Sequence, residues 1–363
     1  MNTACFILGT LLFALAPLSW VARPESSKGV VSGCPTPFED SGRATQALSR
    51  FTFSEPHMGT RFKIIVYATE EAAAKRAVQA AFARVAALDA MMSDYRPTSE
   101  LMQLCRKAGG GPVLVSKELF FVLSRAQEVS RLSDGAFDVT VGPIVRLWRL
   151  ARRSHELPDP KELAEARALV GYQNIRLDNQ KQTVQLLKAG MRLDLGGIAK
   201  GYAADEALGV LEQQGIKCAL VAAGGDIAVS GPPPGAKGWK IGIAPLEDPD
   251  SKPSRYLVLH DAAVSTSGDT EQYVEIEGKR YSHIVDPKTG LGLVGRQSVT
   301  VTARRGITAD SLTKVVSVLG PQKGFRLIES TEDAAALVIR KSDHGLETFQ
   351  SKRFPQFSST QRR

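Results

Sequence analysis

Hydrophobic residues recur along the chain with two spacings, one typical of helices and the other of strands. Helical spacing runs through Glu70–Met92, an Ala-rich segment in which Val78, Phe82 and Val85 fall on one face. The same spacing predicts further helices at Lys117–Leu132, Ile198–Gln214, Ala309–Leu319 and Lys323–Ser330. Alternating or continuous apolar runs predict strands at Phe62–Tyr67, Val184–Leu195, Ala219–Val229, Trp239–Ala244, Tyr256–Leu259, Tyr273–Ile276, Tyr281–Val285, Ser298–Ala303 and Ala334–Ile339.

Helices and strands are mixed without the regular strand–helix–strand alternation of a parallel sheet, and this order predicts the α+β class. No internal repeat is visible, and strand signals resume directly after the one strong interior break at Pro232–Gly235. We therefore expect one composite domain over 51–341. A linker rich in Ser, Gly and Pro precedes it over 23–50, and a polar, basic tail follows it over 342–363.

The N-terminal segment 1–22 is predicted to be a signal peptide or a membrane anchor. Nineteen residues from Ala4 to Ala22 carry no charge, enough for the apolar part of a signal peptide and just enough to cross a bilayer. No Lys or Arg precedes this run, and no A-x-A cleavage site follows it. Val31-Ser32-Gly33-Cys34 looks like a lipoprotein cleavage site, although polar residues separate it from the apolar run. We expect export to the periplasmic side of the inner membrane. A cleaved signal, an uncleaved anchor and lipidation at Cys34 all remain open.

The composition is that of an ordinary globular protein. Of the 363 residues 43% are hydrophobic and 23% are charged, which excludes a disordered chain and a protein with many membrane spans. The net charge is +8, but three of these charges belong to the residues from Lys341 onward, and no dense Lys/Arg cluster with interleaved aromatic residues occurs. We therefore expect no nucleic-acid partner. The four cysteines are scattered without the spacing of a zinc site.

The strongest local chemical signal is the segment Leu193–Tyr202. It predicts an apolar strand that runs through the Gly196-Gly197 turn into a helix. Two residues without Cβ let a ligand approach the backbone, and a helix N-terminus with Lys200 nearby favours phosphate. The same residues are also typical of an ordinary strand-to-helix turn. They match neither the P-loop nor the dinucleotide-binding fingerprint.

Other candidate residues are ambiguous when each is taken alone. Asp310 begins a predicted helix with Thr313 and Lys314 on the same face, which suits either a Mg²⁺ ligand or a plain Asp–Lys pair. Gly224-Gly225-Asp226 predicts a hairpin turn. His283 near a strand end is either a hydrogen-bonded core residue or a catalyst.

Taken together, these segments resemble the ApbE family, the FAD:protein FMN transferases. The resemblance covers nearly all of residues 55–341. It rests on six blocks in order: Met58-Gly59-Thr60; Ser93-Asp94-Tyr95 with Ser99-Glu100; Asp134–Pro143 with Leu147-Trp148; Asp194–Ala203 with Gly224-Gly225-Asp226; Ser265–Asp269 with Arg280–Gly290; and Ala309-Asp310.

The resemblance implies two α+β lobes with a ligand cleft between them, in which FAD is held with Mg²⁺ on its pyrophosphate. FMN is then moved onto a Thr or Ser hydroxyl of an acceptor redox protein as a phosphoester, and AMP is released. The implied FAD contacts are Met58, Tyr95, Ala136, Phe137, Asp138, Asp194, Lys200 and Val285. The metal is implied to bind the Gly197 carbonyl and the Asp310 carboxylate, and His283 to activate the acceptor hydroxyl.

One position departs from the family pattern. The family usually places Thr or Ser four residues after the metal-binding Asp, and here that position is Lys314. An ammonium group has only hydrogen-bond donors and cannot ligate Mg²⁺. Three arrangements remain open: Thr313 replaces the missing ligand, the metal is held by fewer protein ligands, or Lys314 places its own charge where the metal belongs.

Two other functions use the same site. An FAD pyrophosphatase would replace the acceptor hydroxyl with water and release free FMN and AMP. A non-catalytic protein would only hold FAD. Since the chain has no convincing flavin-acceptor sequence of its own, we expect the acceptor to be another exported or membrane-associated protein.

Overall fold

The computed structural model describes residues 47–247, 252–253, 255–268, 273–354 and 358–359. The predicted signal or anchor over 1–22, the linker up to residue 46, Cys34 and Asp269 lie outside the described residues. Within the described part of the chain, no helix is both long and apolar enough to cross a membrane.

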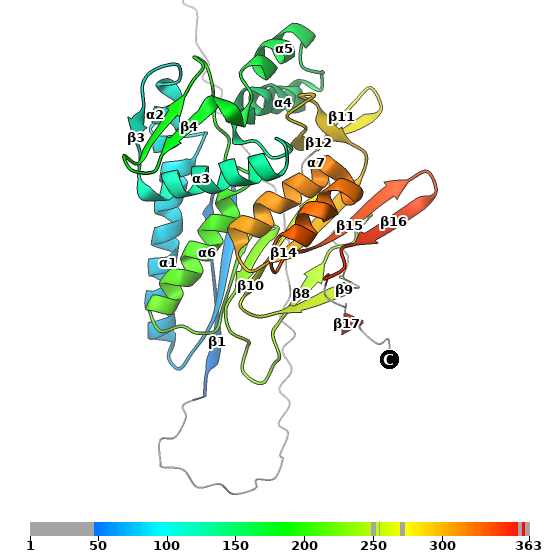
Figure 1. Ribbon diagram of the computed structural model, residues 1–363. Helices are drawn as coiled ribbons and strands as arrows, with labels where there is room; N and C mark the ends of the chain where they lie inside the picture. Colours follow the sequence, from blue (N-terminus) through cyan, green and yellow to red (C-terminus); the bar gives the residue numbers. More distant parts are fainter. Residues whose placement is uncertain (1–46, 248–251, 254, 269–272, 355–357, 360–363) are drawn as a thin grey trace, which may run out of the picture. The chain divides into compact units, whose positions relative to one another are not determined.

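An antiparallel sheet of eight strands forms the centre of the fold (Figure 1). Each strand pairs with its neighbours in the order β1-β2-β6-β7-β10-β14-β15-β16. The bounds of these strands are β1 Ser49–His57, β2 Thr60–Ala68, β6 Ala219–Ala223, β7 Asp226–Val229, β10 Ala262–Gly268, β14 Gln297–Ala303, β15 Ala335–Ser342 and β16 Gly345–Gln350.

Both faces of this sheet are covered by other elements, and its strands contribute side chains to a core on each face. In β2, Phe62, Ile64 and Val66 enter the main core with the helices, whereas Ile65 belongs to a second core on the opposite face. Alternation of side chains along a strand produces this division. The second core is completed by β8 (Trp239–Ile243) and β9 (Arg255–Leu259), which pair with each other; β9 also pairs with β17 (Ser358–Ser359).

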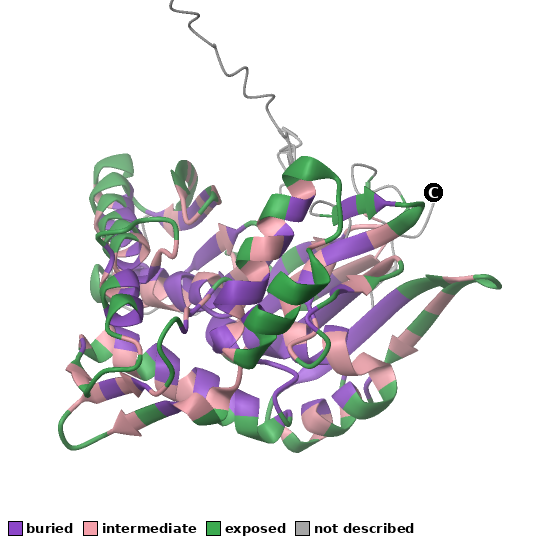
Figure 2. Ribbon diagram, turned by 90° about the horizontal axis from the view of Figure 1, so that it is seen from above, coloured by how far each residue is buried: buried purple, intermediate pink, exposed green. Residues whose placement is uncertain are grey.

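Helices α1 (Glu71–Met92), α6 (Ala199–Gln213) and α7 (Gly306–Ser330) provide the main core on the other face, and α3 (Lys117–Leu132) adds to it. In Figure 1, α6 lies between α1 and α7. Figure 2 shows the buried residues gathered along the strands and on the inward sides of the helices. This layer brings the start of α6 close to the start of α7.

Smaller elements surround this centre. A third core joins α4, α5 and the small β11-β12-β13 sheet through Ile144, Trp148, Ala166, Tyr281 and Val285. The bounds of the remaining elements are α2 Glu100–Arg106, β3 Val113–Leu114, α4 Gly142–Ser154, α5 Pro160–Ala168, β4 Ile175–Asp178, β5 Thr183–Leu186, β11 Tyr273–Ile276, β12 Lys279–Val285 and β13 Gly292–Val294, with single 3₁₀ turns at Val139–Val141 and Tyr172–Asn174.

The mixed α+β class is confirmed, and so are the predicted helices at α1, α3 and α6. The predicted strand Val184–Leu195 is wrong beyond Leu186, because the following apolar residues are buried outside any strand and the N–H of Asp194 donates to the carbonyl of Val139. The run Ala219–Val229 is a hairpin whose turn is Gly224-Gly225, where Gly224 has a φ of 65°.

The C-terminal part of the chain agrees with the prediction at α7 and differs from it in the tail. Gly320, with a φ of 72° and a ψ of 175°, is not helical and precedes Pro321, so it divides α7 into two helical parts that match the helices predicted at 309–319 and 323–330, although the first part already begins at Gly306. The expected polar tail begins with β16, which pairs with β15 at the edge of the sheet, and Phe354 is buried in the second core. An edge strand exposes one side to water, so its polar sequence resembles a tail.

Helices α6 and α7 meet at a pair of glycines. A Cβ added to Gly201 would lie 2.2 Å from the carbonyl oxygen of Gly306, and one added to Gly306 would lie 2.5 Å from the carbonyl oxygen of Gly201. The carboxylate of Asp205 on α6 then accepts hydrogen bonds from the N–H groups of Gly306 (2.6 Å) and Ile307 (3.1 Å). These donors have no partner within α7 itself, so α6 supplies the N-terminal cap of α7.

We expect Gly201→Ala to lower the free energy of unfolding by about 3 kcal/mol, because the new methyl group would overlap with the backbone of α7. Gly209→Ala is the matched control in the same helix, since a Cβ at Gly209 meets no atom within 4 Å. This control should gain about 0.5–1 kcal/mol from the higher helix propensity of Ala. Urea unfolding followed by circular dichroism measures the free energy of unfolding of both variants. Equal changes in the two variants would contradict this packing argument.

Candidate functional site

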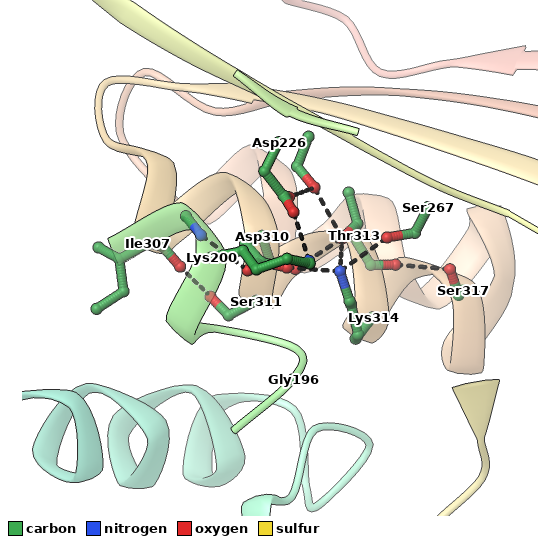
Figure 3. Close-up of polar contacts among 12 residues, drawn as sticks. Gly196, Lys200, Asp226, Ser267, Ile307, Asp310, Ser311, Thr313, Lys314 and Ser317 are labelled. Carbon is green, nitrogen blue, oxygen red and sulfur yellow. Dashed lines mark hydrogen bonds and ion pairs between the residues drawn. The ribbon is translucent and has the colours of Figure 1, made fainter. Parts of the chain in front are cut away.

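Two lysines and two aspartates lie together where α6, α7, β7 and β10 meet (Figure 3). Lys200 comes from the first turn of α6 and Asp226 from the first residue of β7. Asp310 and Lys314 lie four residues apart on α7, on the same side of the helix. We call these four residues the paired-charge cluster.

The first pair in this cluster is Lys200 and Asp226. The Lys200 Nζ lies 2.5 Å from Asp226 Oδ2, and the Ser265 hydroxyl donates to Asp226 Oδ1 at 2.6 Å. Burial alone raises the pKa of Asp226, but the positive charges of Lys200 and Lys314 lower it by more, so its pKa lies below the usual value. Burial lowers the pKa of Lys200, but the carboxylates of Asp226 and Asp310 outweigh it and raise this pKa above its usual value. Both groups are therefore ionised at neutral pH.

The second pair is Asp310 and Lys314. Asp310 is fully buried; its Oδ1 lies 2.5 Å from Lys314 Nζ, and its Oδ2 accepts a hydrogen bond from the N–H of Gly201 at 3.1 Å. The Lys314 ammonium also donates to the hydroxyls of Ser267 (2.8 Å) and Thr313 (3.1 Å). All three ammonium hydrogens therefore have an oxygen acceptor.

A second group of charges flanks the Gly196-Gly197 turn. Arg149 on α4 binds the carboxylates of Asp94 and Asp194, with 2.8 Å between Nη2 and Asp194 Oδ2. Asp194 Oδ1 accepts from the N–H of Gly196 at 2.8 Å, which fixes the turn that leads to α6. Burial, and then repulsion by Asp94, raise the pKa of Asp194 above its usual value. The Tyr95 ring stacks on Arg149, 4.2 Å from Cζ to the ring centroid, and is 72% exposed.

Asp138 is buried, and its carboxylate accepts hydrogen bonds from nearby groups of the protein. It accepts hydrogen bonds from the backbone N–H groups of Thr140 (2.8 Å) and Tyr172 (2.7 Å) and from the Thr140 hydroxyl (2.7 Å). Burial nevertheless raises its pKa. These bonds order the segment in which Ala136 and Phe137 are buried. A Cβ added to Gly197 would lie 3.3 Å from Phe137, so this segment reaches the turn before α6.

The other predicted site residues lie in different parts of the fold. Met58 has a φ of 48° in the turn between β1 and β2 and packs against the main core. Val285 is buried in the third core, and His283 is half-buried two residues earlier on β12. The structure thus places Gly197 and Phe137 next to Lys314, and Lys200, Asp310 and Thr313 in or beside the paired-charge cluster. Asp194 and Tyr95 lie beside the Gly196-Gly197 turn. Among the described residues, no three His, Cys, Asp or Glu side chains gather as a metal site.

Ser265, Ser267 and Arg149 take part in the site although the sequence predicted no role for them. Two serines separated by one residue on a strand lie on the same face, so the Ser-Thr-Ser run of β10 could have indicated a polar face. Arg149 had no comparable signal. Its partners Asp94 and Asp194 are 55 and 45 residues away in the chain, and only the tertiary structure brings them together.

Comparison with known proteins gives a consistent result. The sequence profile of the ApbE family matches residues 58–338. A Klebsiella pneumoniae (strain 342) protein named FAD:protein FMN transferase is 33% identical over 294 residues, covering 80% of this chain and 90% of that protein. A Haemophilus influenzae protein of the same name is 35% identical over 280 residues, covering 75% of this chain and 81% of that protein.

Two solved structures have a similar fold. The flavin transferase ApbE from Vibrio cholerae has a TM-score of 0.75 and 30% identity, and the match covers 85% of this chain and 98% of that one. The apo form of the Pseudomonas stutzeri flavinyl transferase ApbE has a TM-score of 0.75 and 27% identity, covering 85% and 97%. The fold, the order of the motifs and these similarities lead to one conclusion: the chain belongs to the ApbE family.

Proposed function

We propose that this protein transfers FMN from FAD to a Thr or Ser hydroxyl of an acceptor protein and releases AMP. The name FAD:protein FMN transferase of its relatives supports this proposal. The observation that carries it in this chain is the Lys200 ammonium at the start of α6. Within the described residues, its sole hydrogen-bond partner is Asp226, so two of its N–H donors remain for the pyrophosphate of a ligand.

The reaction exchanges the phosphoanhydride bond of the FAD pyrophosphate for a phosphoester bond to the acceptor. The acceptor oxygen attacks the phosphorus on the FMN side, the bond from that phosphorus to the bridging oxygen breaks, and AMP leaves with this oxygen. We propose that the proton of the acceptor hydroxyl goes to His283, since a neutral imidazole accepts protons near neutral pH. Lys200 balances the negative charge that moves onto AMP.

The remaining predicted contacts define where FAD is expected to lie. We propose that it occupies the space between two α+β lobes, with the pyrophosphate at Lys200 and the Gly196-Gly197 turn. Tyr95 supports this placement, because it is 72% exposed and its ring is held by Arg149 next to the same turn. An exposed aromatic ring with a fixed orientation is suited to stacking against a planar ring of a ligand.

The magnesium ion implied by the family resemblance does not fit the oxygen atoms at Asp310. Mg²⁺ binds oxygen lone pairs, but Asp310 Oδ1, Ser267 Oγ and Thr313 Oγ1 each accept a hydrogen bond from Lys314. Charges of +1 and +2 held about 4 Å apart repel by about 8 kcal/mol at an effective dielectric constant of about 20. We therefore assign no step of the reaction to a metal ion.

We further propose that the protein works on the periplasmic side of the inner membrane, attached through its N-terminus. The uncharged run Ala4–Ala22 in the sequence supports export. An acceptor in the same compartment would be another exported or membrane-associated flavoprotein.

The proposed transfer predicts a covalent product. Incubation of the protein with FAD and a domain that carries a flavin-acceptor Thr should add one FMN mass to the domain and release an equal amount of AMP. Mass spectrometry and nucleotide chromatography measure both products. Free FMN with AMP would identify a pyrophosphatase instead. Bound FAD without AMP, with an acceptor that another transferase modifies, would identify a binding protein.

His283→Gln should slow FMN transfer by about 100-fold or more, because general base catalysis typically contributes this much. FAD affinity, measured by flavin fluorescence, should remain unchanged. His260→Gln is the control, since His260 is exposed and is paired with Asp261 on another part of the surface. A transfer rate of His283→Gln equal to that of this control would rule out the proposed base.

A further inference from the structure

The Lys314 ammonium occupies a complete oxygen cage. Asp310 Oδ1, Ser267 Oγ and Thr313 Oγ1 surround its Nζ at 2.5, 2.8 and 3.1 Å (Figure 3). Only 15% of the Lys314 side chain is exposed, and Asp310 is fully buried. A buried carboxylate and two hydroxyls that all face one positive charge form a cation site.

The two hydroxyls in this cage are already oriented to accept. Thr313 donates its own hydrogen to the backbone carbonyl of Asp310 at 2.6 Å, and Ser267 donates its hydrogen to Thr313 Oγ1 at 3.1 Å. Both oxygens therefore turn lone pairs toward Lys314 Nζ. Because both hydroxyl hydrogens are donated to other oxygens, the hydroxyl oxygens of the cage act as acceptors for a cation.

The aliphatic stem of Lys314 is also held in place. A Cβ built on Gly197 would lie 3.2 Å from Lys314 Cγ and 3.5 Å from Cε, so the stem passes directly over this glycine. Phe137 lies on the same side, 3.3 Å from the same Cβ position. The absence of a side chain at Gly197 thus makes room for the lysine, and the neighbouring ring limits its movement.

The charges of the cluster balance without any ion. Lys200 pairs with Asp226 and Lys314 pairs with Asp310, so two ammonium groups face two carboxylates. A divalent ion in the cage would have to displace Lys314 and leave a net positive cluster. The folded cluster has no unpaired negative charge that would attract a divalent ion.

We propose that Lys314 is the resident cation of this site and takes the place of Mg²⁺, so that FMN transfer by this chain does not depend on a divalent metal. This inference rests on the proposed function. Because all three of its N–H donors are used within the cage, Lys314 acts on the pyrophosphate through its charge and by fixing Asp310 and Ser267. It is a positioning residue, whereas Lys200 has donors left for direct contact.

Metal binding tests this inference without any assay of activity. Mn²⁺, a spectroscopic substitute for Mg²⁺, is titrated into the metal-stripped full chain and followed by electron paramagnetic resonance. The wild type should show no saturable site. Lys314→Thr, which replaces the ammonium with a hydroxyl ligand, should show one saturable site, at least about tenfold tighter than any residual binding by the wild type, a difference of about 1.4 kcal/mol. Lys323→Thr is the control, because it makes the same change at an exposed position of α7 and should behave like the wild type.

Thermal unfolding and transfer assays provide two further readouts. In EDTA the wild type should keep its FMN transfer activity. Lys314→Thr should lose transfer and unfold at a lower temperature in EDTA, because Asp310 is left unpaired, and Mg²⁺ should restore both properties. A saturable Mn²⁺ site in the wild type, or loss of wild-type transfer in EDTA that Mg²⁺ reverses, would overturn the inference.

The two proposals can fail separately. If no variant modifies an acceptor or releases AMP under any condition, the proposed function is wrong, and the Mn²⁺ titration still decides whether Lys314 fills the cation site. If Lys314→Thr does not fold, the titration of the wild type alone decides it, since a saturable metal site there contradicts a resident ammonium.

Discussion

The close contact between α6 and α7 at Gly201 and Gly306 is the constraint on which the site depends. With no side chain between them, the two backbones approach closely enough for the N–H of Gly201 to reach Asp310 and for Asp205 to cap α7. Lys200 precedes Gly201 by one residue, so the same contact sets the position of both lysine–aspartate pairs. A larger residue at either glycine would separate the helices and, with them, the charges.

This packing explains how two buried carboxylates and two partly buried ammonium groups can be held together. An isolated buried charge is strongly unfavourable, and a buried pair is tolerated only when its remaining hydrogen-bonding groups are satisfied. Here Ser265, Ser267, Thr313 and the Gly201 N–H complete the two pairs. Because the lysines and aspartates come from three elements, α6, β7 and α7, these elements must pack together before the cluster exists. The polar centre and the apolar core therefore depend on each other.

The sequence predicted those helices and strands whose positions depend on a local pattern of hydrophobic residues. The bounds of α3 agree with its helical spacing, and Ser116 caps the first turn where the pattern begins. β10 was missed because its Ala, Ser, Thr and Gly residues give no apolar alternation, although its neighbours bury it in the centre of the sheet. The strand expected at 184–195 failed because tertiary packing alone buries Leu193 and Leu195. The pairing of Arg149 with two distant aspartates likewise has no local signature.

Asp310 and Lys314 are neighbours on one helix, and this arrangement has a consequence for how the site is assembled in the cell. A charge supplied by the chain itself is present as soon as α7 has formed and packed, whatever the ion concentration of the compartment. It does not exchange, is not lost to competing chelators and cannot be replaced by the wrong metal. A Lys codon becomes a Thr codon by a single base change, so a site filled by solvent ions and a site filled by the chain can lie one mutation apart.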